Sequence, residues 1–98
     1  MILEHAVLNV KPGRSVEFER AFRQAEPIIS GSGGYLSHQL LHCIDQPDRF
    51  LLLVHWETLE DHVDGFRNSE QYQVWRRLLH DFYDPFPEVD HYEITGPS

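Results

Sequence analysis

Cysteine is almost absent from this sequence: Cys43 is the only one among its 98 residues. A single thiol cannot form a disulfide within the chain, and it cannot supply the several ligands of a cysteine-rich zinc site. Cys43 lies near the end of an expected strand, where we expect an inert, small apolar side chain. The sequence therefore predicts a protein of a reducing compartment.

Basic residues are also scarce. Eight Lys and Arg stand against sixteen Asp and Glu, which gives a formal net charge of -8 at pH 7. Such a charge repels phosphate backbones and anionic lipid surfaces. Nucleic acids and membranes are therefore excluded as expected partners.

Long apolar runs are missing as well. No run approaches the roughly 20 apolar residues that a membrane span requires. The first ten residues contain Glu4 and His5 inside their apolar run, and they lack the basic start and continuous apolar stretch of a signal peptide. We therefore expect a cytoplasmic protein.

What is present is typical of one folded domain. Hydrophobic residues make up 41% and charged residues 24% of a chain whose length is near the commonest domain size. We expect a single domain over residues 1–98, with residues 95–98 as a tail. A chain this short buries only about 60 to 65% of its unfolded surface, which makes a partner subunit favourable.

The first third of the chain predicts a strand and a helix. The apolar, β-branched run at residues 2–10 predicts the strand, and the Pro and Gly that follow predict a turn. From Ser15, a candidate N-cap, apolar residues recur with helical spacing up to the glycine-rich stretch 30–34. Pro27 should kink or fray the last turn. The expected inner face is Phe18, Ala21, Phe22, Ala25, Ile28 and Ile29.

Two strand-like runs, 35–44 and 50–57, are separated by a connection of hairpin length and should pair antiparallel. With His42 opposite Leu51, one face would carry Leu36, His38, Leu40, His42, Leu51, Leu53 and His55. The other face would carry Tyr35, Gln39, Leu41, Cys43, Phe50, Leu52, Val54 and Trp56. Because both faces are largely apolar, we expect helices on one and a second copy of the chain on the other.

The remaining residues predict a broken helix and a short strand. Thr58 and Asp61 approximate a capping box, and apolar residues follow at helical spacing. Residues 68–69 should break this helix, after which an aromatic-rich stripe continues to Asp84. A final strand is expected at 87–94. The predicted order is strand, helix, strand, strand, helix, strand.

This order resembles the antibiotic biosynthesis monooxygenase (ABM) superfamily over nearly the whole chain. The residues that carry the resemblance are the phrase His55-Trp56-Glu57-Thr58-Leu59-Glu60-Asp61, the Gly34-Tyr35 start of the second strand and the aromatic-rich helix after Asn68. The resemblance implies an α+β, ferredoxin-like domain with a four-stranded antiparallel sheet. It further implies a homodimer through the open sheet face, forming a dimeric α+β barrel, and a cavity between each sheet and its own helices.

The resemblance implies two known activities. In the quinone-forming branch, which uses molecular oxygen without metal or flavin, Trp56 and Arg76 match working positions. Leu52 stands where an Asn is expected and His62 where a Tyr is expected. A leucine cannot stabilise a phenolate, whereas the imidazole of His62 can act as an acid or base.

In the heme-degrading branch, an Asn, a Trp and a His are needed. Ala6, Phe66 and Arg76 stand at those positions, so heme degradation is not expected. The resemblance thus predicts no cofactor and no metal ion.

The candidate site follows from both arguments. The predicted catalytic residues are His62, Arg76 and Trp56, and the predicted pocket residues are Glu4, Leu52, Phe66, Tyr72 and Trp75. Four of these eight residues have a structural alternative. Trp56 can be a core aromatic, Arg76 an exposed ion-pair partner, and His62 a satisfied buried polar group. Glu4 can be a base in the cavity or an edge residue that reaches solvent or an arginine.

Four histidines raise the alternative of an interface metal site. His5, His38, His42 and His55 share one sheet face in the expected register. A tight site needs ligands that converge at short distance, and imidazoles on one face can simply hydrogen-bond across an interface.

The sequence therefore leaves two predicted functions. The first is a cofactor-independent monooxygenase acting on a small aromatic or polyketide-like compound. The alternative is a non-catalytic, small-ligand-binding or stress-related dimeric module that uses the same cavity.

Overall fold

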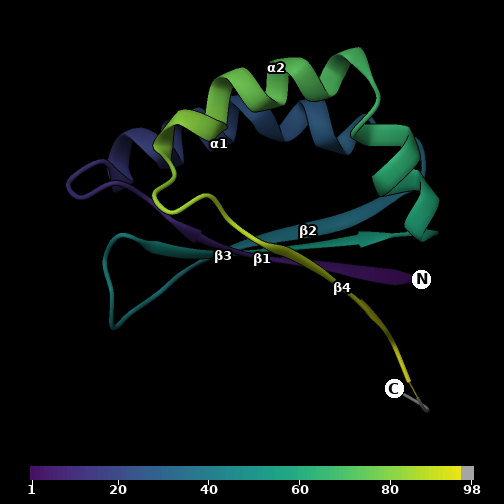
Figure 1. Ribbon diagram of the computed structural model, residues 1–98, viewed down its shortest axis with the longest axis horizontal. Coiled ribbons are helices and arrows are strands. Elements are labelled where there is room, and N and C mark those ends of the chain that lie inside the picture. The colour runs from purple at the N-terminus through teal and green to yellow at the C-terminus, as the bar shows by residue number, and fades with distance from the viewer. Residues whose placement is uncertain (96–98) are drawn as a thin grey trace.

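The structure is a computed structural model that describes residues 1–95. A four-stranded antiparallel sheet forms one layer, with strand order β2-β3-β1-β4, and two helices form the other. Figure 1 shows α1 and α2 side by side over the same face of the sheet, while no helix covers the opposite face. The predicted ferredoxin-like order is confirmed. The last three residues of the expected tail lie outside the described part.

The strands and helices have the following bounds. The strands are β1 (Ile2–Asn9), β2 (Tyr35–His42), β3 (Arg49–Trp56) and β4 (Val89–Glu93). The helices are α1 (Ser15–Ser30), the π-helical segment η1 (Asp61–Phe66), α2 (Glu70–Leu79) and the 3-10 turn η2 (His80–Phe82). None of the described helices is both long enough and apolar enough to cross a bilayer.

Helix α1 buries the face that the periodicity predicted. Phe18, Phe22, Ala25 and Ile29 are buried against the sheet. Ser15 is the first residue of the helix and not its N-cap, because Arg14 takes that position without a side-chain bond. The helix continues through Pro27 to Ser30, so the fraying expected at the proline is not observed. Proline removes one backbone donor near the end of the helix, where few bonds follow.

The connection from β3 to η1 is held by the predicted capping box. The Asp61 backbone N–H donates to Oγ1 of Thr58 (3.2 Å), and the Thr58 backbone N–H donates to Oδ2 of Asp61 (3.2 Å). The Asp61 carboxylate also lies against Gly34, which precedes β2 with φ +80°. A Cβ at Gly34 would overlap this carboxylate, so glycine is required there for both reasons.

The register of the hairpin differs by one residue from the prediction. His42 pairs with Phe50 rather than Leu51, and the Cys43 N–H donates to the Arg49 carbonyl (2.9 Å) as the strands separate. An irregularity between Tyr35 and Ser37 further shifts the pairing. Because side chains alternate along a strand, the β2 side chains from His38 to His42 lie on the opposite face of the sheet from the predicted one.

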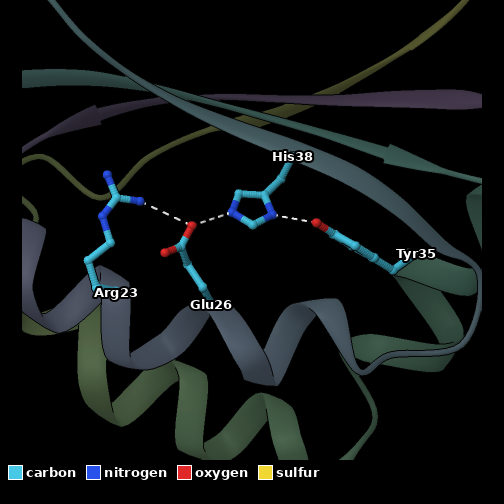
Figure 2. Close-up of polar contacts among 4 residues, drawn as sticks. All are labelled: Arg23, Glu26, Tyr35 and His38. Atoms are coloured by element: carbon cyan, nitrogen blue, oxygen red, sulfur yellow. Dashed lines mark hydrogen bonds and ion pairs between the residues drawn. The ribbon is translucent and has the colours of Figure 1, made fainter.

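His38 and His42 therefore face the helices, whereas His5 and His55 lie on the open face. Nε2 of His38 contacts Oε2 of Glu26 (2.7 Å) on α1, as Figure 2 shows. The single histidine face on which the interface metal site depended does not exist. In residues 1–95, no three His, Cys, Asp or Glu side chains come together in a way that could hold a metal ion.

The open face of the sheet still carries an apolar patch after this correction. Leu51 and Leu53 of β3 alternate with buried residues, and Val7 on β1 is 36% exposed. Leu41 of β2 and Tyr92 of β4 extend the surface, at 43% and 50% exposed. The inner face, by contrast, is closed over by the helices and carries the core.

Candidate active site

A cavity of about 370 Å³ lies between the sheet and its helices. This volume is within the range of small-molecule sites. Its apolar wall is formed by Ala6, Leu8, Ile29, Leu52, Phe66, Trp75, Phe86, Pro87 and Val89. Its polar groups are Glu4, His62, Arg67, Tyr72, His80 and Tyr83. All five predicted pocket residues line this cavity, and so does His62.

Glu4 is a buried carboxylate at the centre of the sheet. It lies on β1, which pairs with β3 on one side and β4 on the other, and it is only 5% exposed. The alternation of β1 places Glu4, Ala6 and Leu8 on the inner face. The alternative of an edge residue that reaches solvent is therefore wrong, because β1 is a central strand.

One hydrogen bond holds the Glu4 carboxylate, and the His62 imidazole lies beside it. Nε1–H of Trp56 donates to Oε1 of Glu4 (2.9 Å), and Nε2 of His62 lies 3.3 Å from the same oxygen. Trp56 is fully buried, and its ring stacks on the His62 ring at a centroid distance of 5.2 Å. Trp56 does not line the cavity itself. It positions the carboxylate from behind.

His62 connects Glu4 to β4. Nδ1 of His62 lies 2.8 Å from Nε2 of His91. These two ring nitrogens share one hydrogen bond, and which of them donates depends on the tautomers of the rings. The three side chains lie in a row from the cavity to the partly exposed edge strand, with His62 between the other two.

Burial sets the protonation of Glu4 and His62. Burial raises the pKa of Glu4 to about 6, although the Trp56 hydrogen bond and the Arg67 charge act against it. Burial also lowers the pKa of His62 to about 3, and the charges of Arg67 and His91 add to this effect. His62 is therefore neutral near pH 7, so its 3.3 Å contact with Glu4 is not an ion pair.

A second polar group lies at the other end of the cavity. The His80 ring contacts the rings of Tyr72 and Tyr83 at centroid distances of 5.9 and 6.0 Å. Burial lowers the pKa of His80, with a further contribution from Arg76. Burial and Tyr72 raise the pKa of Tyr83, so this hydroxyl stays protonated. The cavity thus combines an acid–base end with an end of neutral hydrogen-bonding groups.

Arg76 does not lie in this cavity. Trp75 and Leu79 form the buried face of α2, and the residue after Trp75 points away from it and is exposed. The guanidinium that lines the cavity belongs to Arg67, directly after η1. Sequence reasoning also missed His80, Tyr83 and His91. The only available signal was the spacing of His80 from Tyr72, eight residues along the helix.

A ferredoxin-like domain with a buried acid–base group in a cavity between sheet and helices is the class defined by this fold and site. The antibiotic biosynthesis monooxygenase family model matches residues 1–78, and the chain belongs to this family. It is 56% identical over 93 residues to YczJ, an uncharacterised protein of Bacillus subtilis strain 168, covering 95% of this chain and 98% of YczJ.

Solved structures agree with this assignment. A Bordetella bronchiseptica protein, itself provisionally an antibiotic biosynthesis monooxygenase, is 35% identical with a TM-score of 0.91 and 96% coverage of both chains. SnoaB, a cofactor-independent oxygenase from Streptomyces nogalater, is 14% identical with a TM-score of 0.85, covering 98% of this chain and 94% of SnoaB. At that identity the likeness to SnoaB shows the fold alone.

Proposed function

We propose that this protein is a cofactor-independent monooxygenase that converts a small aromatic or polyketide-like phenol into a quinone. The observation that carries the proposal is the buried Glu4 carboxylate, which lines a largely apolar cavity and has a pKa of about 6. A general base is most effective when its pKa lies close to the ambient pH. Family membership supports the class of reaction, and SnoaB is a cofactor-independent oxygenase of the same fold.

The proposed reaction starts with proton transfer. The Glu4 carboxylate accepts the proton of a phenolic hydroxyl, and the phenolate ring carbon then forms a bond to molecular oxygen. Protonated Glu4 returns its proton to the peroxide, which gives a hydroperoxide on a dienone. Loss of the ring C–H proton and cleavage of the O–O bond release water and leave the quinone. The substrate supplies all four electrons, and one oxygen atom enters the product.

Other residues in and behind the cavity have supporting roles in this proposal. Trp56 donates to Glu4, which favours the ionised form of the carboxylate and fixes its direction, and the His62 imidazole lies beside it. Leu52, Phe66 and Trp75 contact the flat ring of the substrate, and Tyr72 binds a hydroxyl or carbonyl at the far end. Arg76 has no part in this proposal, because its side chain is exposed on α2.

The dimer is part of the same proposal. Two copies would pack through the open sheet face, where Val7, Leu41 and Tyr92 are each at least about one third exposed. An apolar sheet face of this kind is rarely left in water. Sedimentation equilibrium at micromolar concentration should give a dimer, and a monomer would contradict this arrangement. We also propose a cytoplasmic location, because a chain with a single cysteine suits a reducing compartment.

The direct test is oxygen uptake with a panel of naphthols and hydroquinones under air. Uptake with a naphthol should equal the quinone formed, because each turnover consumes one molecule of oxygen. Heat-inactivated protein is the control for spontaneous oxidation. Uptake no faster than this control across the panel would contradict the monooxygenase.

A non-catalytic binding module is the alternative, favoured by one observation. Leu52 lines the cavity and offers no polar group to a developing oxyanion. This alternative predicts that naphthols bind, as measured by calorimetry, without oxygen uptake. Binding together with uptake would contradict it.

A further inference from the structure

Arg67 is a charged cavity residue for which the reaction above supplies no role. It follows Phe66 at the end of η1, and its backbone N–H donates to the His62 carbonyl (3.1 Å). This five-residue spacing is that of a π-helix, and it turns the Arg67 side chain into the cavity wall. The same segment therefore positions both His62 and Arg67.

The Arg67 guanidinium has no protein partner in the part of the chain that the structure describes. None of the ion pairs or side-chain hydrogen bonds of residues 1–95 includes it. A guanidinium carries five N–H donors in a planar fork that matches two oxygen atoms of one anion. Donors of this kind that line a cavity, without a protein acceptor, are available to a ligand.

The positive charge of Arg67 nevertheless acts inside the cavity. For Glu4 it acts against the stronger effect of burial, which raises the pKa. For His62 and His91 it adds to burial in lowering the pKa, and the three residues lie on three different elements. Arg67 is not a contact counter-ion of Glu4, because the two side chains form no ion pair. The donor to Glu4 is Trp56 instead.

The charge of the whole molecule makes this position informative. A protein of net charge -8 repels anions from its surface. An anion enters a cavity of such a protein only where a local cation compensates, and Arg67 is the only lysine or arginine among the residues that line this cavity.

We propose that Arg67 binds an anionic oxygen of the ligand, so that the cavity selects flat aromatic compounds that carry a carboxylate or an acidic enol over neutral aromatics of the same size. This inference deepens the proposed function, and it depends on that proposal only for the use of the cavity as the ligand site. The anionic group lies at Arg67, and the ring lies against Phe66, Trp75 and Leu52.

The test uses two ligands with the same ring and nearly the same shape, 2-naphthoate, which is an anion, and 2-naphthamide, which is neutral. Binding is measured by calorimetry on the intact protein. This measurement does not depend on oxygen consumption. The unaltered protein should bind naphthoate about tenfold more tightly than naphthamide. Arg67→Gln should weaken naphthoate binding by about 10- to 100-fold, since a charge-assisted hydrogen bond contributes on that order. Naphthamide binding should change by less than about twofold.

Two further variants separate charge from shape. Arg67→Lys keeps the charge but loses the planar fork, so it should restore part of the naphthoate affinity. Arg77→Gln removes an exposed arginine of α2 and should leave both affinities unchanged. Unfolding midpoints of all variants check that each is folded.

Three results would overturn the inference. Naphthoate binding that survives Arg67→Gln, an equal loss for both ligands, or no binding of either ligand to the unaltered protein would each do so. The preference for naphthoate can hold even where no phenol is oxidised, so failure of the monooxygenase and failure of this inference are separately visible.

Discussion

Two carboxylate–histidine networks lie on the same side of the sheet, yet their environments differ. One consists of Glu4 and His62, which line the cavity, and His91, which contacts His62 from β4. The other consists of Glu26 and His38, and it extends to Arg23 and Tyr35 between α1 and β2, as Figure 2 shows. The Tyr35 hydroxyl donates to Nδ1 of His38 (2.5 Å), and Nε2–H of His38 donates to Glu26 (2.7 Å).

The difference between the two carboxylates lies in what compensates their charge. Burial would raise the pKa of Glu26, but the hydrogen bonds from His38 and Arg23 outweigh it and lower the pKa. For Glu4, burial outweighs the hydrogen bond from Trp56 and the charge of Arg67, and the pKa rises. The Glu26 network therefore stabilises the packing of α1 on β2. Burial instead destabilises the ionised form of Glu4, and the raised pKa suits a group that transfers protons.

The largest expected effect is on the reaction. Glu4→Gln keeps the shape and the acceptor for Trp56 but removes the base, so oxidation of an active naphthol should slow by about 10²-fold or more. Glu26→Gln is the matched control, because it alters the other carboxylate–histidine pair. Its rate of oxygen uptake should stay within about twofold of the unaltered protein. Equal losses in the two variants would remove the distinction between the networks.

The pH dependence of the reaction gives the next effect. Glu4 acts as a base only when ionised, and its pKa is about 6. The quantity kcat/KM should therefore rise about tenfold per pH unit below that value and level off above it. Glu26→Gln should leave this midpoint in place. A profile that is flat between pH 5 and pH 7 would show that another group accepts the proton.

The smallest effects are on stability, and they should have opposite signs. The pKa of Glu4 is 4.5 in the unfolded chain and about 6 when folded. Between these values the unfolded chain loses its proton first, so stability falls as pH rises, by about 2 kcal/mol in total. Glu4→Gln removes this loss and should raise the free energy of unfolding above pH 6. Urea denaturation at pH 4 and pH 7.5 measures the change.

Glu26→Gln should do the reverse. A lowered folded pKa means that ionised Glu26 stabilises the fold above its unfolded pKa, and this stability is lost as pH falls through the folded pKa. The substitution should therefore lower the free energy of unfolding at pH 7.5 by less than about 1 kcal/mol, because the pair is partly solvated. The difference should disappear in acid. The same sign for both variants would contradict the comparison.

The order of the elements was predictable because local signals specify it. The helical spacing from Phe18 to Ile29, the capping box of Thr58 and Asp61, and the turn residues between the strands each act within a few residues. Glu4 could also be placed on the inner face, since alternation along a single strand needs no partner.

The histidine faces were not predictable, because they depend on register. One residue of slip in the hairpin decides whether His38 faces α1 or a second subunit, and the slip depends on the Cys43–Arg49 bond and the irregularity after Tyr35. Periodicity gives the alternation of each strand but not the offset between two strands.

Arg67 and His91 were missed for related reasons. The segment from Asp61 to Phe66 is a π-helix, which has more residues per turn than an α-helix. The α-helical spacing used on the sequence therefore does not show which side of the segment Arg67 occupies. His91 enters the site only through the pairing of β4 with β1, where it lies opposite Glu4. Such a pairing joins residues far apart in sequence, and no local pattern reveals it.

Gly34 is distant from the ligand, yet it constrains the wall that the ligand meets. Its missing side chain lets the Asp61 carboxylate close against the start of the hairpin, and that carboxylate begins the turn which carries His62 and Arg67. The start of β2 and the polar wall of the cavity are thus connected through Asp61. Any redesign of ligand preference therefore has to keep Gly34.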